Sequence, residues 1–195
     1  MAKVYVSWAV SALVLIIIAI AIGQGSRKKW YGILLDTNNK VSLSQFQTVL
    51  WTILVLSLIV GVFVARLIDG AGDPLAFEIP DELLILMGLT YGSTVLATAV
   101  KVGKGLTQRA EPALKQLWTV EEGARQDQDT DVTRLQNVAL VVIGVLAYIA
   151  TVVAKFNLLG GASAVTKLPD FDPSWVTLLG ISYAAYVVGK LPTRE

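Results

Sequence analysis

Residues 42–67 read SLSQFQTVLWTILVLSLIVGVFVARL, and residues 131–156 read DVTRLQNVALVVIGVLAYIATVVAKF. The two stretches align without gaps at an offset of 89 positions, and each closes with a cation one residue before its end. Ser42 with Gln45 has the spacing of a capping box, and Asp131 is the equivalent N-cap. The apolar run that follows each cap has the roughly 20 residues that a helix needs to cross a bilayer. Each stretch therefore predicts a membrane-spanning helix.

A second alignment follows the first. Residues 82–98 match residues 174–190 at an offset of 92, and each copy follows a proline, Pro80 or Pro173, that suits a first helical turn. The two alignments predict two tandem helical hairpins that insert into the membrane in the same direction. Such a pair would form a four-helix core with a pseudo-twofold axis along the membrane normal. The alternative, a coincidental likeness of two apolar hairpins, stays open on the sequence alone.

The composition is typical of a membrane protein. The 195 residues are 54% hydrophobic and 16% charged, with a net charge of +1 and a mean hydropathy of +0.63. A further apolar stretch at 4–23 precedes the hairpins, so we expect an all-α polytopic transmembrane bundle of about five spans. The spans at 83–100 and 175–191 are the least apolar and the shortest, and full crossing or re-entry is open for both. The predicted divisions are an N-terminal span at 1–25, a basic interfacial loop at 26–46, a first hairpin at 47–102, an amphipathic and acidic linker at 103–134, a second hairpin at 135–191 and a tail at 192–195.

Charge bias predicts the orientation. Lysines and arginines follow the first, third and fifth spans, whereas the other two loops are mostly acidic. By the positive-inside rule we expect an external N-terminus and a cytoplasmic C-terminus. The residues expected to anchor the chain at the interfaces are Arg27, Lys28, Lys29, Trp30, Arg66 and Lys155.

Several residue types are missing. The sequence has no cysteine and no histidine, so it lacks thiolate ligands, the commonest general base and the usual metal ligand. We found no phosphate loop, nucleophile elbow or metal motif. The sequence predicts no enzyme, no cofactor and no metal site, and its near-neutral charge predicts no nucleic-acid partner.

Small residues recur at helical spacing in the second helix of each hairpin. Gly88 and Gly92 share one face, as do Gly180 and Ala184. Small faces of this kind allow close approach of membrane helices. They favour a non-enzymatic anchor, scaffold or subunit of a larger membrane assembly, with the bilayer, a second copy or other membrane subunits as partners.

A polar stripe on the same two helices suggests an alternative. Its residues are Thr90, Thr94 and Thr98 in the first hairpin and Ser182 and Tyr186 in the second. Such stripes could line an oligomeric channel or pore. They could equally bond carbonyl groups of their own helices. A carrier is disfavoured because the predicted span interiors hold no charge.

The linker at 103–134 is the only sizeable part expected outside the membrane. Residues 111–118 suggest an amphipathic helix on the membrane or on a partner, and Glu121 and Glu122 begin an acidic, solvated continuation. We keep this segment as a candidate surface for a cytoplasmic partner, against the alternative of a solvated linker.

The segment WYGILLD at 30–36, with SLSQFQ at 42–47 and LWT at 50–52, resembles a pattern in an uncharacterised family of prokaryotic multi-pass membrane proteins. There a Gly-hydrophobic-Asp turn and a Ser-Leu-Ser-x-x-Gln stretch precede a span that bears Trp-Thr. The resemblance covers roughly residues 30–100 and implies the cytoplasmic membrane of a prokaryote. It implies no activity and no functional residues.

Overall fold

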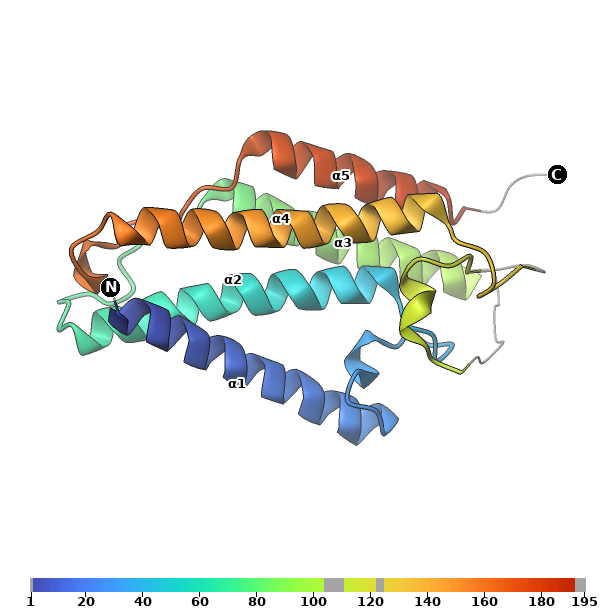
Figure 1. The fold of residues 1–195 in the computed structure, drawn as a ribbon, viewed down its shortest axis with the longest axis horizontal. Coiled ribbons are helices and arrows are strands. Elements are labelled where there is room, and N and C mark those ends of the chain that lie inside the picture. The colour runs from blue at the N-terminus through green and yellow to red at the C-terminus, as the bar shows by residue number, and fades with distance from the viewer. Residues whose placement is uncertain (1, 104–110, 122–124, 192–195) are drawn as a thin grey trace.

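The computed structural model describes residues 2–103, 111–121 and 125–191. Within them the chain is helical, with three isolated bridges but no strand of a sheet. The helices lie side by side in one bundle (Figure 1), which confirms the expected all-α architecture. The α-helices are α1 (Ala2–Arg27), α2 (Leu43–Ile68), α3 (Asp81–Gly103), α4 (Val132–Asn157) and α5 (Pro173–Val188), and the short 3-10 helices are η1 (Gly32–Leu34), η2 (Leu114–Leu117) and η3 (Ala162–Ala164).

Four of the α-helices are long and apolar enough to cross a membrane, namely α1, α2, α3 and α4. Helix α5 is apolar but has only 16 residues. At 1.5 Å per residue it is about 24 Å long, which is shorter than the roughly 30 Å of a hydrocarbon core. The fifth helix is therefore present as expected, but it does not reach the length of a span.

The helix bounds follow the repeat in the sequence. Helices α2 and α4 both have 26 residues, and both ends of α4 lie 89 positions after those of α2. Within each hairpin the second helix packs against the first, and the hairpins meet through α2 with α4 and α3 with α5. Because α2 and α4 run one way and α3 and α5 the other (Figure 1), the four helices have the arrangement expected of a parallel repeat.

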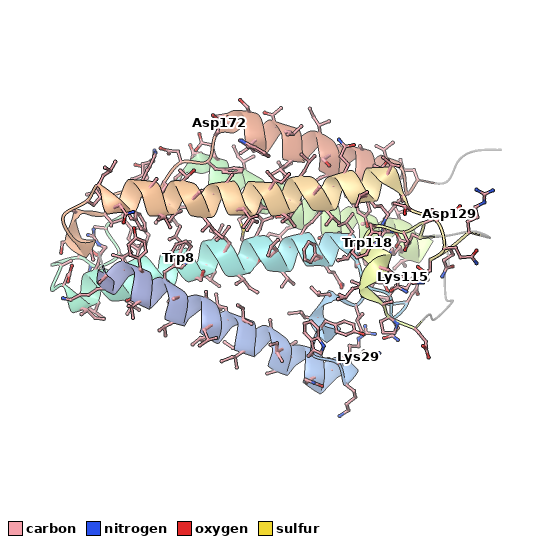
Figure 2. All side chains as sticks on the ribbon, viewed as in Figure 1. Trp8, Lys29, Lys115, Trp118, Asp129 and Asp172 are labelled. Atoms are coloured by element: carbon pink, nitrogen blue, oxygen red, sulfur yellow. The ribbon has the colours of Figure 1, made fainter. Side chains whose placement is uncertain are left out.

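Helix α1 packs mainly along α2, outside the four-helix core. The contact is closest at Gly61, where an added Cβ would lie 2.6 Å from the Cα of Trp8. The indole of Trp8, which Figure 2 labels on the side of α1 that faces α2, donates a hydrogen bond to the Ser57 hydroxyl at 3.1 Å. Glycine at position 61 thus lets the two backbones approach.

Helix starts agree with the predicted caps in one hairpin only. Asp131 caps α4 by accepting from the amide of Arg134 at 3.2 Å. Ser42 is the N-cap residue of α2, but its hydroxyl bonds that of Ser44 at 3.0 Å and caps no amide. The predicted capping box with Gln45 is therefore wrong.

The predicted boundaries differ slightly from the helices. Helices α2 and α4 begin at Leu43 and Val132, before the expected positions 47 and 135. The first turn of each helix carries polar side chains that form hydrogen bonds within the protein. A hydropathy pattern therefore places these first turns outside the apolar span, although they are helical. The predicted tail at 192–195 and residues 104–110 and 122–124 of the predicted linker lie outside the described residues.

Candidate functional site

Charged side chains gather at the end of the bundle where α3 and α5 finish and α2 and α4 begin. We call this the charged end; it includes the loop at 28–42 and the segments at 111–121 and 125–131, and it lies on the right in Figure 1. The chain returns to this end three times, so residues far apart in sequence meet there.

Glu121 is the centre of this charged end. Its carboxylate accepts Arg134 Nη1 at 2.7 Å and Lys190 Nζ at 2.9 Å, and it also pairs with Lys101. The three cations come from the last turn of α3, the first turn of α4 and the residue pair after α5. All three are buried, so a single carboxylate joins the ends of three helices.

The loop that precedes α2 joins the same cluster through Asp36. Its carboxylate pairs with Lys101 at 2.5 Å and accepts the amides of Asn38 and Lys40. Lys40 in turn donates its ammonium to the backbone carbonyl of Glu121 at 2.9 Å. The Asp36 turn, which is typical of Asx chemistry, thus positions two cations near Glu121.

The segment before Glu121 is held in place by hydrogen bonds between side chains and backbone groups. The guanidinium of Arg134 donates to the carbonyls of Gln116 and Leu117, and the Gln116 amide oxygen accepts from the Val41 amide at 2.9 Å. Residues 114–117 form one 3-10 turn, so the amphipathic helix predicted at 111–118 is wrong there. The solvated acidic continuation is also wrong at Glu121, while Glu122 lies outside the described residues.

The exposed part of this segment faces away from the cluster. Lys115 and Trp118 lie on the surface, and so does Asp129 on the acidic stretch (Figure 2). The expected cytoplasmic partner surface at 103–134 therefore stays a prediction, and these residues are the part of it that a partner would meet.

Burial and charge shift the pKa of Glu121 and Lys190, the two shifted groups of the cluster that lie outside the helices. Burial alone would raise the pKa of Glu121, but its three cations outweigh this effect and hold the pKa far below its usual range. For Lys190, burial and the neighbouring cations Lys101 and Arg134 outweigh the attraction of Glu121 and lower the pKa to about 8. The cluster therefore keeps its carboxylate ionised.

A cavity of about 280 Å³ opens beside the cluster, between the first turn of α4 and the last turn of α5. We call it the charged-end cavity. Two cations, Arg134 and Lys190, and two carboxylates, Glu121 and Asp131, line it, together with Ala185, Tyr186 and Gly189 from the end of α5. The ammonium of Lys190 lies 4.5 Å from the centroid of the Tyr186 ring, a cation–π distance.

The small residues predicted for helix packing lie mostly on the surface. Gly88, Gly92 and Ala184 are exposed, and a Cβ at Gly88 or Gly92 would meet no other described residue within 4 Å. Only Gly180 faces a neighbouring helix, 3.3 Å from a methyl group of Leu89 on α3. The prediction that these small residues pack against other helices of the same chain is therefore wrong except at Gly180. The two glycines of α3 face outward instead.

The threonines predicted to line a pore lie against their own chain. Thr90 is buried and donates its hydroxyl to the carbonyls of its preceding turn. Thr94 shares a hydrogen bond with the hydroxyl of Thr48 on α2 at 2.7 Å, and Thr98 donates to the Thr94 carbonyl. Thr94 thus takes part in the α2–α3 contact, and the alternative in which these hydroxyls bond carbonyl groups of their own helix is confirmed for all three threonines. The lining of an oligomeric pore stays a prediction.

The matching stripe on α5 also has structural partners. The carbonyl of Ser182 accepts the side-chain amide of Asn137 at 3.2 Å, and the oxygen of that amide accepts from Gln47 at 2.6 Å. Tyr186 is buried in the charged cluster. These contacts tie α5 to α4 and α2 and leave neither residue on a channel wall within the chain.

The predicted interface anchors divide into two groups. Arg27, Lys28 and Trp30 are exposed and Lys29 is half-buried, and Lys155 is exposed beside Asp170. Arg66 is instead buried, so its predicted role as a snorkelling anchor is wrong. Its guanidinium donates to the carbonyls of Ser163, Val165 and Asp73.

The comparisons with known proteins found no relative. No family model, no curated protein and no solved structure matches the chain. Among the described residues no group of three or more aspartates and glutamates could hold a metal ion.

Sequence reasoning missed the charged cluster, although one signal was present. Arg134 shares a helical face with Asn137, Val141 and Tyr148, which are all buried. A cation in register with a buried stripe requires a buried anion, and the nearby acidic residues of the linker were the candidates.

Proposed function

We propose that the protein is a non-enzymatic integral membrane protein that serves as an anchor, scaffold or subunit of a larger membrane assembly. In this proposal it lies in the cytoplasmic membrane of a prokaryote, as the family resemblance implies, with the charged end on the cytoplasmic side. The excess of Lys and Arg in the loops at that end supports this orientation.

The observation that carries the proposal is the outward-facing small surface of α3. Gly88 and Gly92 lie one turn apart on the exposed side of an apolar helix of 23 residues, with open space beyond both. Glycine weakens a helix, so two glycines on a lipid-facing surface are costly unless another helix packs there. A helix of a second copy of the chain, or of another membrane subunit, would pack closely against these two glycines.

The charged cluster supports a structural role rather than a catalytic one. Its carboxylate is paired with three cations, and its pKa lies far below the range of a general base at neutral pH. Glu121 is therefore suited to hold the helix ends together, which gives an assembly subunit a rigid shape.

The experiment is to substitute the glycines and measure association. Gly88→Leu and Gly92→Leu should leave the fold intact because no described atom lies within 4 Å of the added Cβ. We expect both variants to lose most of the higher-mass species that native mass spectrometry detects for the wild type in mild detergent. Ala139→Leu, on the exposed side of α4, is the matched control and should leave association unchanged.

The proposal is wrong if the wild type is strictly monomeric in lipid nanodiscs and carries no other membrane protein. It is equally wrong if the glycine variants associate as the wild type does. The channel alternative has less support, because the residues expected to line it bond within the chain.

A further inference from the structure

We infer that a basic and aromatic surface at the charged end binds the headgroups of anionic phospholipids. The surface joins two parts of the chain, residues 27–31 at the end of α1 and residues 112–118, and we call it the headgroup platform. It depends on the proposed function only for the location of the chain in a membrane. Its ligand is lipid, whereas the surface of α3 is proposed to contact another membrane helix.

A hydrogen bond and a small apolar cluster join the two parts of the platform. The Tyr31 hydroxyl donates to the carbonyl of Pro112 at 3.2 Å. Leu117 is buried in a cluster against which Tyr31 also packs. Helix η2 therefore lies next to the loop that follows α1 (Figure 1). The two parts form one surface, although about 80 residues separate them in the sequence.

The course of this loop places the platform at the depth of the lipid headgroups. Gly32 packs so closely on Gly23 that an added Cβ would overlap the Gly23 carbonyl oxygen. Gly23 ends the apolar run of α1, so the loop returns to the level at which the hydrocarbon core ends. At 1.5 Å per residue, Arg27 lies about 6 Å beyond Gly23 along the helix. The headgroup layer on one side of a bilayer has about this thickness.

The buried interior of the charged end is balanced in charge. Its four buried cations are matched in number by four carboxylates, and the exposed Arg125 pairs with Asp129 at 3.2 Å. The buried cations are Lys40, Lys101, Arg134 and Lys190, and the carboxylates are those of Asp36, Glu121, Asp127 and Asp131. A surplus of charge among the described residues of this end therefore belongs to the platform.

The platform has four cations and one carboxylate. Arg27, Lys28 and Lys115 are exposed and Lys29 is half-buried, and none of them forms an ion pair with another described residue. The carboxylate of Glu111, at the edge of the platform, leaves a surplus of three positive charges. Anionic phospholipids supply the complementary charge, and each lysine or arginine near a membrane surface adds to the attraction.

Two tryptophans give the platform the character of a membrane interface. Trp30 is 56% exposed and Trp118 is 37% exposed. Figure 2 shows Lys115 between Lys29, at the end of α1, and Trp118, near the start of α2. Tryptophan is enriched at the level of the headgroups, because its ring is apolar and its N–H is polar. Cations interleaved with such rings match a layer of phosphate groups above an apolar core.

The first test locates the platform relative to the bilayer. The chain has no cysteine, so Leu114→Cys and Gln128→Cys can each be labelled with the fluorophore NBD; both positions are exposed. Each labelled chain is placed in nanodiscs of equal parts dioleoyl phosphatidylcholine and dioleoyl phosphatidylglycerol. We expect a lipid spin-labelled on its headgroup to quench the label at Leu114→Cys at least threefold more than the control, and aqueous iodide to do the reverse. Equal quenching by iodide would overturn the inference and leave this surface to a soluble partner.

The second test removes charge from the platform. The full-length protein is stripped of lipid in detergent and titrated with dioleoyl phosphatidylglycerol or dioleoyl phosphatidylcholine, and bound lipid is counted by native mass spectrometry. We expect phosphatidylglycerol to bind at least threefold more tightly, and the double variant Arg27→Gln with Lys115→Gln to lose most of this preference. Equal binding of the two lipids to the wild type would overturn the inference.

The matched control removes two cations from the opposite end of the bundle. Lys155 and Lys167 are exposed but already pair with Asp170, so Lys155→Gln with Lys167→Gln should keep the preference for phosphatidylglycerol. An equal loss in both double variants would show attraction to net charge alone and overturn the platform as a site. Both tests use single chains, so their outcome is independent of association through α3.

Discussion

The two hairpins have matching first helices and different second helices. Helices α2 and α4 have the same length and the same place in the repeat, but α3 has 23 residues and α5 has 16. The difference falls at the charged end, where α3 carries Lys101 into the cluster from within its last turn and α5 ends so that Lys190 enters it from the following loop. The repeat thus builds a symmetric scaffold, and the charged-end cavity lies at the end where the two hairpins differ.

Equivalent residues of the two hairpins can also face opposite ways. Tyr91 and Tyr183 occupy the same repeat position, yet Tyr91 is 45% exposed and Tyr183 only 2%. Tyr91 bonds Thr52 on its hairpin partner, whereas the Tyr183 hydroxyl accepts the indole of Trp51 from the other hairpin. The repeat position fixes the residue type but not its contacts, because the second helices sit differently on the first ones.

The largest effect should come from removing the carboxylate of Glu121, which pairs with Lys101 of the first hairpin and with Arg134 and Lys190 of the second. Glu121→Gln leaves three buried cations without their anion, so we expect the free energy of unfolding to fall by about 3–5 kcal/mol. Unfolding in mixed micelles titrated with SDS measures it. Glu111→Gln, an exposed control on the same segment, should stay within about 0.5 kcal/mol of the wild type; equal effects would refute the role of the cluster.

The next largest effect should separate the two cations that end α2 and α4. Arg66 and Lys155 are equivalent in the repeat, but Arg66 is buried on three backbone carbonyls and Lys155 is exposed. Arg66→Met should therefore lower the free energy of unfolding by about 2–3 kcal/mol, since it leaves carbonyls unpaired. Lys155→Met should change it by less than about 0.5 kcal/mol. A similar loss in both variants would contradict the asymmetry.

Gly61 explains why α1 packs on the first hairpin, because the equivalent residue of the second hairpin is Ala150. A methyl group at Gly61 would meet the backbone of Trp8, so Gly61→Ala should cost about 1–3 kcal/mol in the same unfolding assay. Gly88→Ala, where the added methyl meets open space, should be neutral or slightly stabilising because alanine favours the helix. A neutral Gly61→Ala would show that α1 does not pack closely on α2.

The smallest effect should be a pH dependence from Lys190. Its folded pKa is about 8, below the ordinary value of 10.5. Between these values the unfolded chain binds a proton that the folded chain lacks, so the free energy of unfolding rises with pH there, by about 1 kcal/mol per pH unit at most. We expect the wild type to gain stability relative to Lys190→Met between pH 8 and 10. A constant difference across this range would contradict the lowered pKa.

The helices were predictable because their determinants are local. Apolar runs of the right length, the Asp131 cap and the prolines at Pro80 and Pro173 lie within a few residues of the elements they define. The orientation of the small faces was not predictable. Gly88 and Gly180 occupy equivalent positions, but one faces outward and the other contacts Leu89, and only the packing of α3 against α5 decides this.

The charged site was not predictable for a related reason. Asp36, Lys101, Glu121, Arg134 and Lys190 come from two loops, two helices and the end of a third. No single period or spacing connects them, and on the sequence alone these charges indicate only orientation and solvation. They meet because three returns of the chain bring their segments to the same end of the bundle.

The most direct test of the account is a photocrosslink from the outward face of α3. The chain has no cysteine, so Gly92→Cys can be labelled with benzophenone maleimide in its native membrane without a background thiol. We expect a protein adduct at this position, whose mass identifies a second copy or another subunit, and none at the control Ala139→Cys on α4. Equal adducts at both positions, or none at Gly92→Cys, would contradict the proposal that α3 is the assembly surface.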